Sequence, residues 1–184
     1  MKPFKAMLVA TLVGASALAA AVPLKTDPAK SSVAAVFKQM NVPVEAPFRS
    51  FSASIDYDAA KPAASKASVE INTASFDIGD PMYNKEVAKK EWFNSAQFPK
   101  ASFVSTSIAP AGAGKLNVSG KLTLKGKTAD VTFPLAVRTE GGKQVFEGQL
   151  PIKRLAFNIG EGEWKDTSMV ADEVVIKFRV TAAP

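Results

Sequence analysis

The chain has 184 residues and a formal net charge of +6, from 23 Lys and Arg against 17 Asp and Glu, and it contains no histidine and no cysteine. The missing residue types exclude Ser-His-Asp and Cys-His catalysis, zinc and haem sites that depend on histidine, thiol redox chemistry and disulfide bonds. An enzyme built from this chain would have to work with carboxylates, Lys, Tyr or Ser alone.

The first 21 residues have the composition of a secretory signal peptide. Lys2 and Lys5 precede the uncharged run 6–22, which ends in small residues with Ala-x-Ala cleavage sites at 17–19 and 19–21. A membrane-spanning helix needs about 20 predominantly apolar residues, so an uncleaved anchor is the less favoured alternative, and the absence of cysteine excludes a lipoprotein anchor. We predict that residues 1–21 are a cleaved signal and residues 22–184 a single exported domain.

The exported part is mildly basic. Removing Lys2 and Lys5 leaves 21 − 17 = +4. The lysines are spread along the chain without aromatic interleaving, which argues against nucleic acid as a partner. Such a charge fits either a weak, transient attraction to anionic lipid headgroups or simply a soluble surface.

Alternation of apolar and polar residues dominates the rest of the chain. Such a period of two predicts half-buried β-strands with their apolar residues inward. The inward residues are Val33, Ala35 and Phe37 in run 31–39; Phe51, Ala53, Ile55 and Tyr57 in run 49–57; Leu116, Val118, Leu122 and Leu124 in run 115–124; Val131, Phe133, Leu135 and Val137 in run 129–137; and Val174, Ile176, Phe178 and Val180 in run 172–180.

The connections between the runs predict antiparallel neighbours. Lys125–Thr128 and Glu140–Lys143 are short Gly-containing turns, and 59–66 and 109–114 are longer links. Several short strands at this spacing indicate an all-β barrel or a sandwich. A barrel of about eight strands can be filled by side chains or hold one small ligand. We expect small inward residues such as Gly120 and Gly148 to leave room inside.

One segment, 81–94, breaks the alternation and predicts a short helix. Asp80 is the expected N-cap and Pro81 the first helical residue. Met82, Val87 and Trp92 are candidates for a lid over the barrel mouth. A helix packed outside the barrel fits the sequence equally well.

Acidic residues crowd into 158–173: Glu161, Glu163, Asp166, Asp172 and Glu173. Paired carboxylates can act as general acid and base, and clustered oxygens can bind calcium, but the spacing lacks the order of a calcium loop. Lys153, Arg154 and Lys165 are available as charge partners. We interpret the segment as a solvated turn and predict neither a metal site, a cofactor nor catalytic residues. The alternative is a carboxylate enzyme that uses Glu161 with Glu163, or Asp56 with Asp58.

Several phenylalanines fall in strand-like runs, where they serve either as core or as the wall of an apolar tunnel. Because a barrel without an obvious catalytic inventory is better suited to carrying an apolar molecule than to reacting with it, we favour the tunnel.

Four segments resemble the exported YceI-like proteins. They are "EINTASFDIGD" (70–80), "FPKASFVSTSI" (98–108), "VSGKLTLKGKTADVTFPL" (118–135) and "KRLAFNIGEGEWKDTSMVADEVVIKFRV" (153–180). The resemblance implies an all-β, eight-stranded antiparallel lipocalin-like barrel with a short helical insertion. It also implies an apolar tunnel that binds a long polyisoprenoid or similar amphiphile in the bacterial periplasm, homodimers in several members, and no catalysis.

The chain departs from the family pattern at its histidines. Lys30 and Gln39 stand where the first strand of the family often has His, and 83–87 replaces a helical segment that contains one. Any role of those histidines in holding a ligand headgroup therefore does not transfer. Trp164 is expected to pack at one end or mouth of the barrel.

Together these arguments predict a periplasmic carrier or sequestering protein, without enzymatic activity, for an isoprenoid-type lipid such as a quinone or polyprenol. The predicted tunnel residues are Val33, Phe37, Phe51, Ile55, Phe103, Leu122, Phe133, Leu135, Phe157 and Phe178. A filled barrel acting as a stress-protective or protein-interaction module is the alternative, and the carboxylate enzyme is the third.

Overall fold

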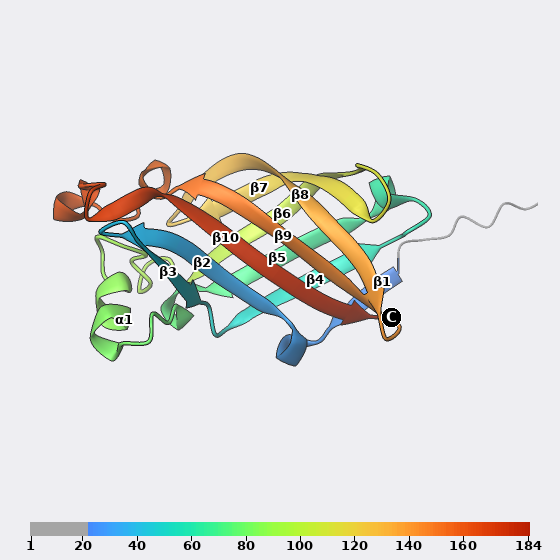
Figure 1. The fold of residues 1–184 in the computed structure, drawn as a ribbon, viewed down its shortest axis with the longest axis horizontal. Coiled ribbons are helices and arrows are strands. Elements are labelled where there is room, and N and C mark those ends of the chain that lie inside the picture. Colours follow the sequence, from blue (N-terminus) through green and yellow to red (C-terminus); the bar gives the residue numbers. More distant parts are fainter. Residues whose placement is uncertain (1–21) are drawn as a thin grey trace, which may run out of the picture.

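Antiparallel strand pairing organises the molecule (Figure 1). The computed structural model describes residues 22–184, so the predicted signal peptide lies outside the described residues. The strands are β1 (Val22–Thr26), β2 (Ser32–Gln39), β3 (Val42–Pro47), β4 (Phe51–Tyr57), β5 (Lys66–Asn72), β6 (Lys100–Pro110), β7 (Lys115–Leu124), β8 (Lys127–Glu140), β9 (Lys143–Lys153) and β10 (Val170–Ala183). The helices are α1 (Pro81–Val87) and the short 3-10 helices η1 (Pro28–Lys30), η2 (Pro62–Ala64), η3 (Thr73–Ser75), η4 (Arg154–Phe157) and η5 (Gly162–Lys165).

Eight of these strands close into a ring. The sheet runs β1-β4-β5-β6-β7-β8-β9-β10, and β10 pairs back onto β1. Every pairing is antiparallel. The structure therefore confirms the predicted eight-stranded antiparallel, lipocalin-like barrel. No helix within residues 22–184 has the length and apolar character that crossing a bilayer requires.

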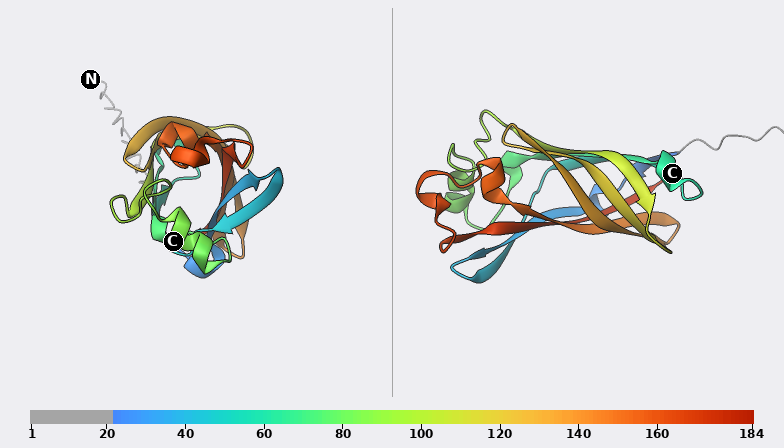
Figure 2. Two further views of the ribbon diagram at one scale, coloured as in Figure 1. Left: turned by 90° about the vertical axis from the view of Figure 1, so that its left-hand side faces the viewer. Right: turned by 90° about the horizontal axis from the view of Figure 1, so that it is seen from above.

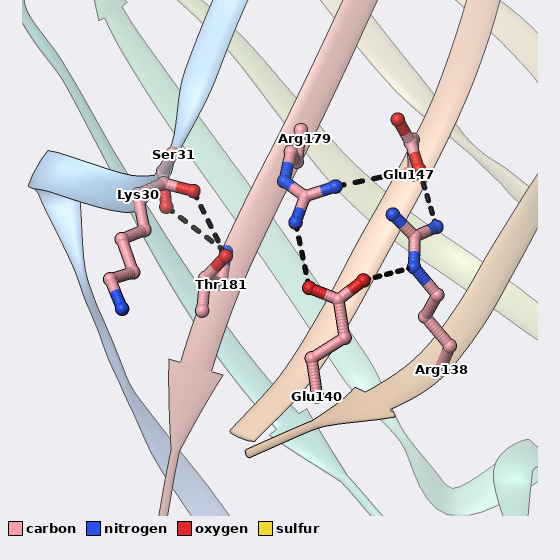
Figure 3. Close-up of polar contacts among 7 residues, drawn as sticks. All are labelled: Lys30, Ser31, Arg138, Glu140, Glu147, Arg179 and Thr181. Atoms are coloured by element: carbon pink, nitrogen blue, oxygen red, sulfur yellow. Dashed lines mark hydrogen bonds and ion pairs between the residues drawn. The ribbon is translucent and has the colours of Figure 1, made fainter. Parts of the chain in front are cut away.

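Strand β2 continues β1 along the same edge of β10. Residues 32–39 pair with 170–179, whereas β1 pairs with Ala182 and Ala183. The η1 turn between them is fastened to β10 at Thr181, whose Oγ1 donates to Lys30 O (2.9 Å) and whose N–H donates to Ser31 Oγ (3.0 Å; Figure 3). Because β3 pairs with β2 alone, the β2–β3 hairpin projects from the wall at the end that carries α1 (Figure 2). We call this end the α1 end.

An ion-pair ring joins three neighbouring strands on the outer face. Arg138 of β8 and Arg179 of β10 each contact both Glu140 of β8 and Glu147 of β9 (Figure 3). Exposed ion pairs contribute only about 0–1 kcal/mol each. The ring therefore fixes side-chain positions more than it stabilises the barrel.

The turns and inward faces follow the sequence pattern. In β7, Leu116, Val118, Leu122 and Leu124 are buried, as predicted. The β7–β8 turn has Lys125 at φ 46° and Gly126 at φ 74°, and the β8–β9 turn is Gly141–Gly142 with two positive φ angles. Positive φ at both central residues matches the right-handed twist of a two-residue hairpin.

Helix α1 begins as predicted but is shorter. The Asp80 carboxylate accepts the Met82 N–H at 2.7 Å and Pro81 occupies the first helical position. The helix ends at Val87, not Asn94, because the chain turns back there: the Phe93 N–H donates to Val87 O, and Asn94 takes a left-handed conformation (φ 49°). This reversal buries Trp92 and Phe93 against the barrel.

Candidate functional site

The barrel encloses an apolar cavity of about 220 Å³. Its wall is formed by inward residues of β2 and β4–β10, and one end is bounded by residues of α1, the segment between η3 and α1, and the segments around η4 and η5. The charged lining residues are Lys66, Glu86 and Arg154. In another protein an apolar cavity of about 150 Å³ stays dry and binds a benzene-sized molecule, so this volume suits an apolar guest.

Three phenylalanine rings pack against one another across the middle of the lumen, at tilted and edge-to-face angles. Phe133 lies between Phe103 and Phe178, with centroid distances of 5.4 Å to each. The rings of Phe103 and Phe178 lie over Gly120 and Gly148, so close that a Cβ at either glycine would fall within 2.6 Å of a ring carbon. The expected room inside exists as this cavity, but it does not lie at these two glycines, because the rings of Phe103 and Phe178 occupy the space over them.

Aromatic side chains also close the α1 end. Phe48, Phe76 and Phe93 pack edge to face with centroid distances of 5.3–5.9 Å. The ring centroids of Trp92 and Trp164 lie 5.3 Å apart, and both residues line the cavity. The predicted packing of Trp164 at the end of the barrel is confirmed.

Arg154 holds the loops of this end together. Its side chain is buried (2% exposed) and all its donors reach backbone oxygens: Nε to Ala171, Nη1 to Ile159 and Gly160, and Nη2 to Trp164 and Val170, at 2.7–3.2 Å. The guanidinium also lies 5.6 Å from the centre of the Trp92 ring. Burial lowers the pKa of Arg154, and the carboxylate of Asp172 opposes that shift. The backbone contacts make Arg154 a structural cation that positions Trp164.

The acidic segment after η4 is tied to lysines of the β7–β8 turn. Lys125 Nζ donates to Glu161 Oε2 (2.9 Å) and to Asn158 O (2.6 Å), and this hydrogen bond holds the pKa of Glu161 below its usual range. Glu173 pairs with Lys153 at 3.7 Å, and Asp166 accepts from Ser168. These carboxylates do not line the cavity, and residues 22–184 bring no three metal-ligating side chains together.

The second carboxylate pair considered for an enzyme, Asp56 and Asp58, lies at the end of β4. Asp58 Oδ1 accepts the N–H groups of Ala60 and Lys61, which shapes the turn after β4. Neither Asp56 nor Asp58 lines the cavity. These contacts give Asp58 a role in shaping the turn, and Asp56 belongs to strand β4.

Most of the predicted tunnel residues face the cavity. The lining includes Val33, Phe37, Ile55, Phe103, Leu122, Phe133, Leu135 and Phe178. Phe51 and Phe157 are outside it. Phe51 is the first residue of β4 and only packs against the core, and Phe157 belongs to η4, where strand alternation no longer decides the direction of a side chain.

Two of the three predicted lid residues also line the cavity, and the third does not. Val87 and Trp92 line the cavity, whereas Met82 points to solvent with 75% of its surface exposed. The neighbouring helical residues Tyr83 and Glu86 line the cavity instead. Sequence reasoning missed them, together with Phe48, Phe76 and Phe93, because they lie in segments without a regular period.

An eight-stranded antiparallel barrel with an apolar lumen and a helical segment over one end defines a lipocalin-like barrel. The family model of the YceI-like domain matches residues 24–182. The chain belongs to the YceI-like domain family. A UPF0312 protein of Shewanella baltica is 35% identical over 154 residues, which are 80% of this chain and 77% of the relative.

Two solved structures share the fold. BcnA of Burkholderia cenocepacia is 57% identical, with a TM-score of 0.84 over 86% of this chain and 100% of that chain. A polyisoprenoid-binding domain from Saccharophagus degradans, implicated in plant cell wall breakdown, is 18% identical, with a TM-score of 0.68 over 88% of this chain and 98% of its own. At that identity the second likeness concerns the fold alone.

Proposed function

We propose that the protein is a periplasmic carrier or sequestering protein that holds a long-chain isoprenoid-type lipid, such as a quinone or polyprenol, in the barrel cavity. The apolar cavity that runs along the lumen is the observation that carries this proposal. The barrel shared with a polyisoprenoid-binding domain supports it. A periplasmic location and a homodimer stay predictions.

The energetics suit an apolar chain. Each buried methylene contributes about 0.8 kcal/mol, so a few isoprene units contribute on the order of 10 kcal/mol before ordering costs are subtracted. Such burial is non-directional. We therefore expect the cavity to select the width and length of the chain more than its chemical identity.

The two alternatives have less support. A filled barrel would act through its surface, but the lumen here is not filled. An enzyme would need reactive groups beside the guest, and the carboxylate considered most closely, Glu161, pairs with Lys125 instead. We therefore favour binding without turnover.

A first test identifies the cargo. Native mass spectrometry of the protein purified from its own host, followed by organic extraction, should reveal one isoprenoid-type lipid per barrel. Protein that is bare and also refuses added quinones and polyprenols would overturn the proposal.

A pair of tryptophan substitutions locates the site. Ala35 is buried and lines the cavity, whereas Ala136 is exposed on β8. Ala35→Trp should fill the lumen and abolish lipid retention, and Ala136→Trp should retain the lipid as the wild type does. Circular dichroism checks that both variants keep the β-barrel. Equal retention by two folded variants would move the lipid out of the lumen.

A further inference from the structure

Exposed apolar side chains gather at the α1 end of the barrel. Among residues 22–184 the large exposed ones are Met40, Val42, Met82, Tyr83 and Met169, all at this end, and Val104 on the wall formed by β6. All three methionines of this part of the chain are in the group. Exposed apolar groups that cluster mark contact with another apolar surface. Figures 1 and 2 show α1, the β2–β3 turn and the start of β10 at that end.

The tip of the β2–β3 hairpin extends the wall of the cavity outward. Val42 lies directly opposite Gln39 in the register, and residues opposite each other share a face of the sheet. Gln39 lines the cavity, so Val42 (61% exposed) carries the same face beyond it.

The hairpin turn itself presents a methionine to solvent. Met40 (φ 46°) and Asn41 (φ 64°) occupy a two-residue turn with two positive φ angles, for which Asn-Gly and Asp-Gly are preferred. A methionine is unfavourable at this φ, and its side chain is 62% exposed. Turn geometry does not explain Met40, whereas contact with an apolar surface does.

The first turn of α1 also carries cavity-lining and exposed apolar side chains. Tyr83 lines the cavity and is exposed, and Met82 beside it is the most exposed of the group. Lys85, Lys89 and Lys90 against Glu86 and Glu91 give residues 81–94 a net charge of 3 − 2 = +1. Lys38 is exposed near the hairpin tip. Apolar tips flanked by lysines suit the boundary between acyl chains and anionic headgroups of a bilayer.

We propose that Met40, Val42 and Met82 form a docking face that rests on the surface of a lipid bilayer while the lipid enters or leaves the cavity between the hairpin and α1. The inference rests on the proposed function, because an isoprenoid chain that crossed water would expose its apolar surface. Docking lets the chain pass from acyl chains to the apolar lumen directly. The apolar side chains reach the acyl boundary, while the lysines stay at the level of the headgroups.

The test is co-flotation of the full-length exported protein with vesicles of phosphatidylethanolamine and phosphatidylglycerol. The variant Met40→Asn/Val42→Thr/Met82→Gln removes the docking face, and no changed side chain lines the cavity. Asn suits the positive φ of residue 40, so the turn keeps its geometry. Val104→Thr is the matched control, because Val104 is 53% exposed on the side wall.

We expect the triple variant to lose at least about ten-fold in vesicle binding, as for an interface that depends on its apolar anchors. Val104→Thr should bind as the wild type does, and lipid binding in vesicle-free solution should be unchanged in both variants. The docking face would be overturned if the wild type did not co-float with these vesicles, or if the triple variant co-floated as well as the wild type. Neither result would contradict the proposed function. If analytical ultracentrifugation shows that the wild type is a dimer and the triple variant is not, the face binds a second copy of the chain. That result would also overturn the assignment of the face to a bilayer.

Discussion

The ring of Phe178 on β10 covers Gly148, the residue directly opposite it on β9. A Cβ built at residue 148 would lie 2.6 Å from Phe178 Cζ and 3.0 Å from Pro134 O. The same ring packs edge to face against Phe133 inside the lumen. The absent side chain at 148 therefore sets where one wall of the cavity lies.

Gly148→Ala should destabilise the barrel by about 1–3 kcal/mol, the usual range for overpacking a well-filled interior. Urea unfolding followed by circular dichroism measures the change. In the Phe178→Ala background the ring is gone, so the cost of Gly148→Ala should fall well below its value in the wild type. An equal cost in both backgrounds would show that the ring is not the obstacle.

Gly120→Ala should cost more than Gly148→Ala. At residue 120 a Cβ would lie 2.4 Å from the backbone oxygen of Val104 and 2.5 Å from the Phe103 ring. A ring at the end of a side chain can rotate, but a carbonyl in a strand moves only with its backbone. Parallel urea titrations of both variants check the order, and a milder effect at 120 would contradict it.

Strand alternation predicted β2, β4, β7, β8 and β10, since each of the five runs with a period of two became one of these strands. It left a barrel and a sandwich open, and the eight-stranded barrel was implied by the family resemblance. Alternation also placed eight of the ten proposed tunnel residues on the cavity wall. Alternation fails where the space beside a residue is decided by a side chain from an adjacent strand. Gly148 looks like free space in its own strand, and only the register with β10 brings Phe178 over it.

The α1 end could not be derived in the same way. Nothing in the sequence distinguishes Arg154, directly after β9, from an exposed cation. In the structure its side chain is buried and donates to backbone oxygens within residues 159–171. The Glu161 carboxylate pairs with Lys125, which lies 36 positions earlier, and not with the lysines or the arginine nearer to it in the sequence. Such contacts depend on which loops meet at one end of a closed barrel, and no local period encodes them.

Arg154→Lys should destabilise the protein by about 2–4 kcal/mol, because a lysine cannot reach all five backbone oxygens and each buried acceptor left unpaired costs about 1–3 kcal/mol. Urea unfolding checks this. Arg179→Lys on the exposed ion-pair ring is the matched control and should cost less than about 1 kcal/mol. Equal effects at the two sites would contradict the structural role of Arg154.

Ligand entry should change the intrinsic fluorescence, because Trp92 and Trp164 are the two tryptophans of the chain and both line the cavity. A quinone-type ligand should quench both, with saturation at one ligand per barrel. Trp92 Nε1 has no hydrogen-bond partner within residues 22–184, so Trp92→Phe breaks no hydrogen bond and keeps an aromatic ring beside Arg154. This makes Trp92→Phe a usable single-tryptophan variant. The Trp92→Phe variant reports Trp164 alone. If extraction shows saturable ligand binding while the emission of Trp164 stays unchanged, the ligand does not lie at this end.

Asp77 should make the α1 end sensitive to strong acid. Its carboxylate accepts hydrogen bonds from Asn84 Nδ2 (2.9 Å), the Gly79 N–H (2.9 Å) and Arg49 Nε (3.0 Å), which lower its pKa from 3.8 to about 2. A carboxyl group whose pKa is lower in the folded state stabilises that state above its unfolded pKa, and the contribution is lost as the pH falls through the folded pKa. The window therefore runs from about pH 4 down to about pH 2.

The variant Asp77→Asn cannot titrate, and it isolates this contribution. Above about pH 4 it should be less stable than the wild type in urea, and the difference should shrink steadily towards pH 2. Hydrogen exchange of the α1 backbone should rise over the same window in the wild type only, because the Asp77–Asn84 contact fixes the helix to the segment before it. A stability difference that stays constant from pH 5 to pH 2 would assign the effect to lost packing instead of the carboxylate charge.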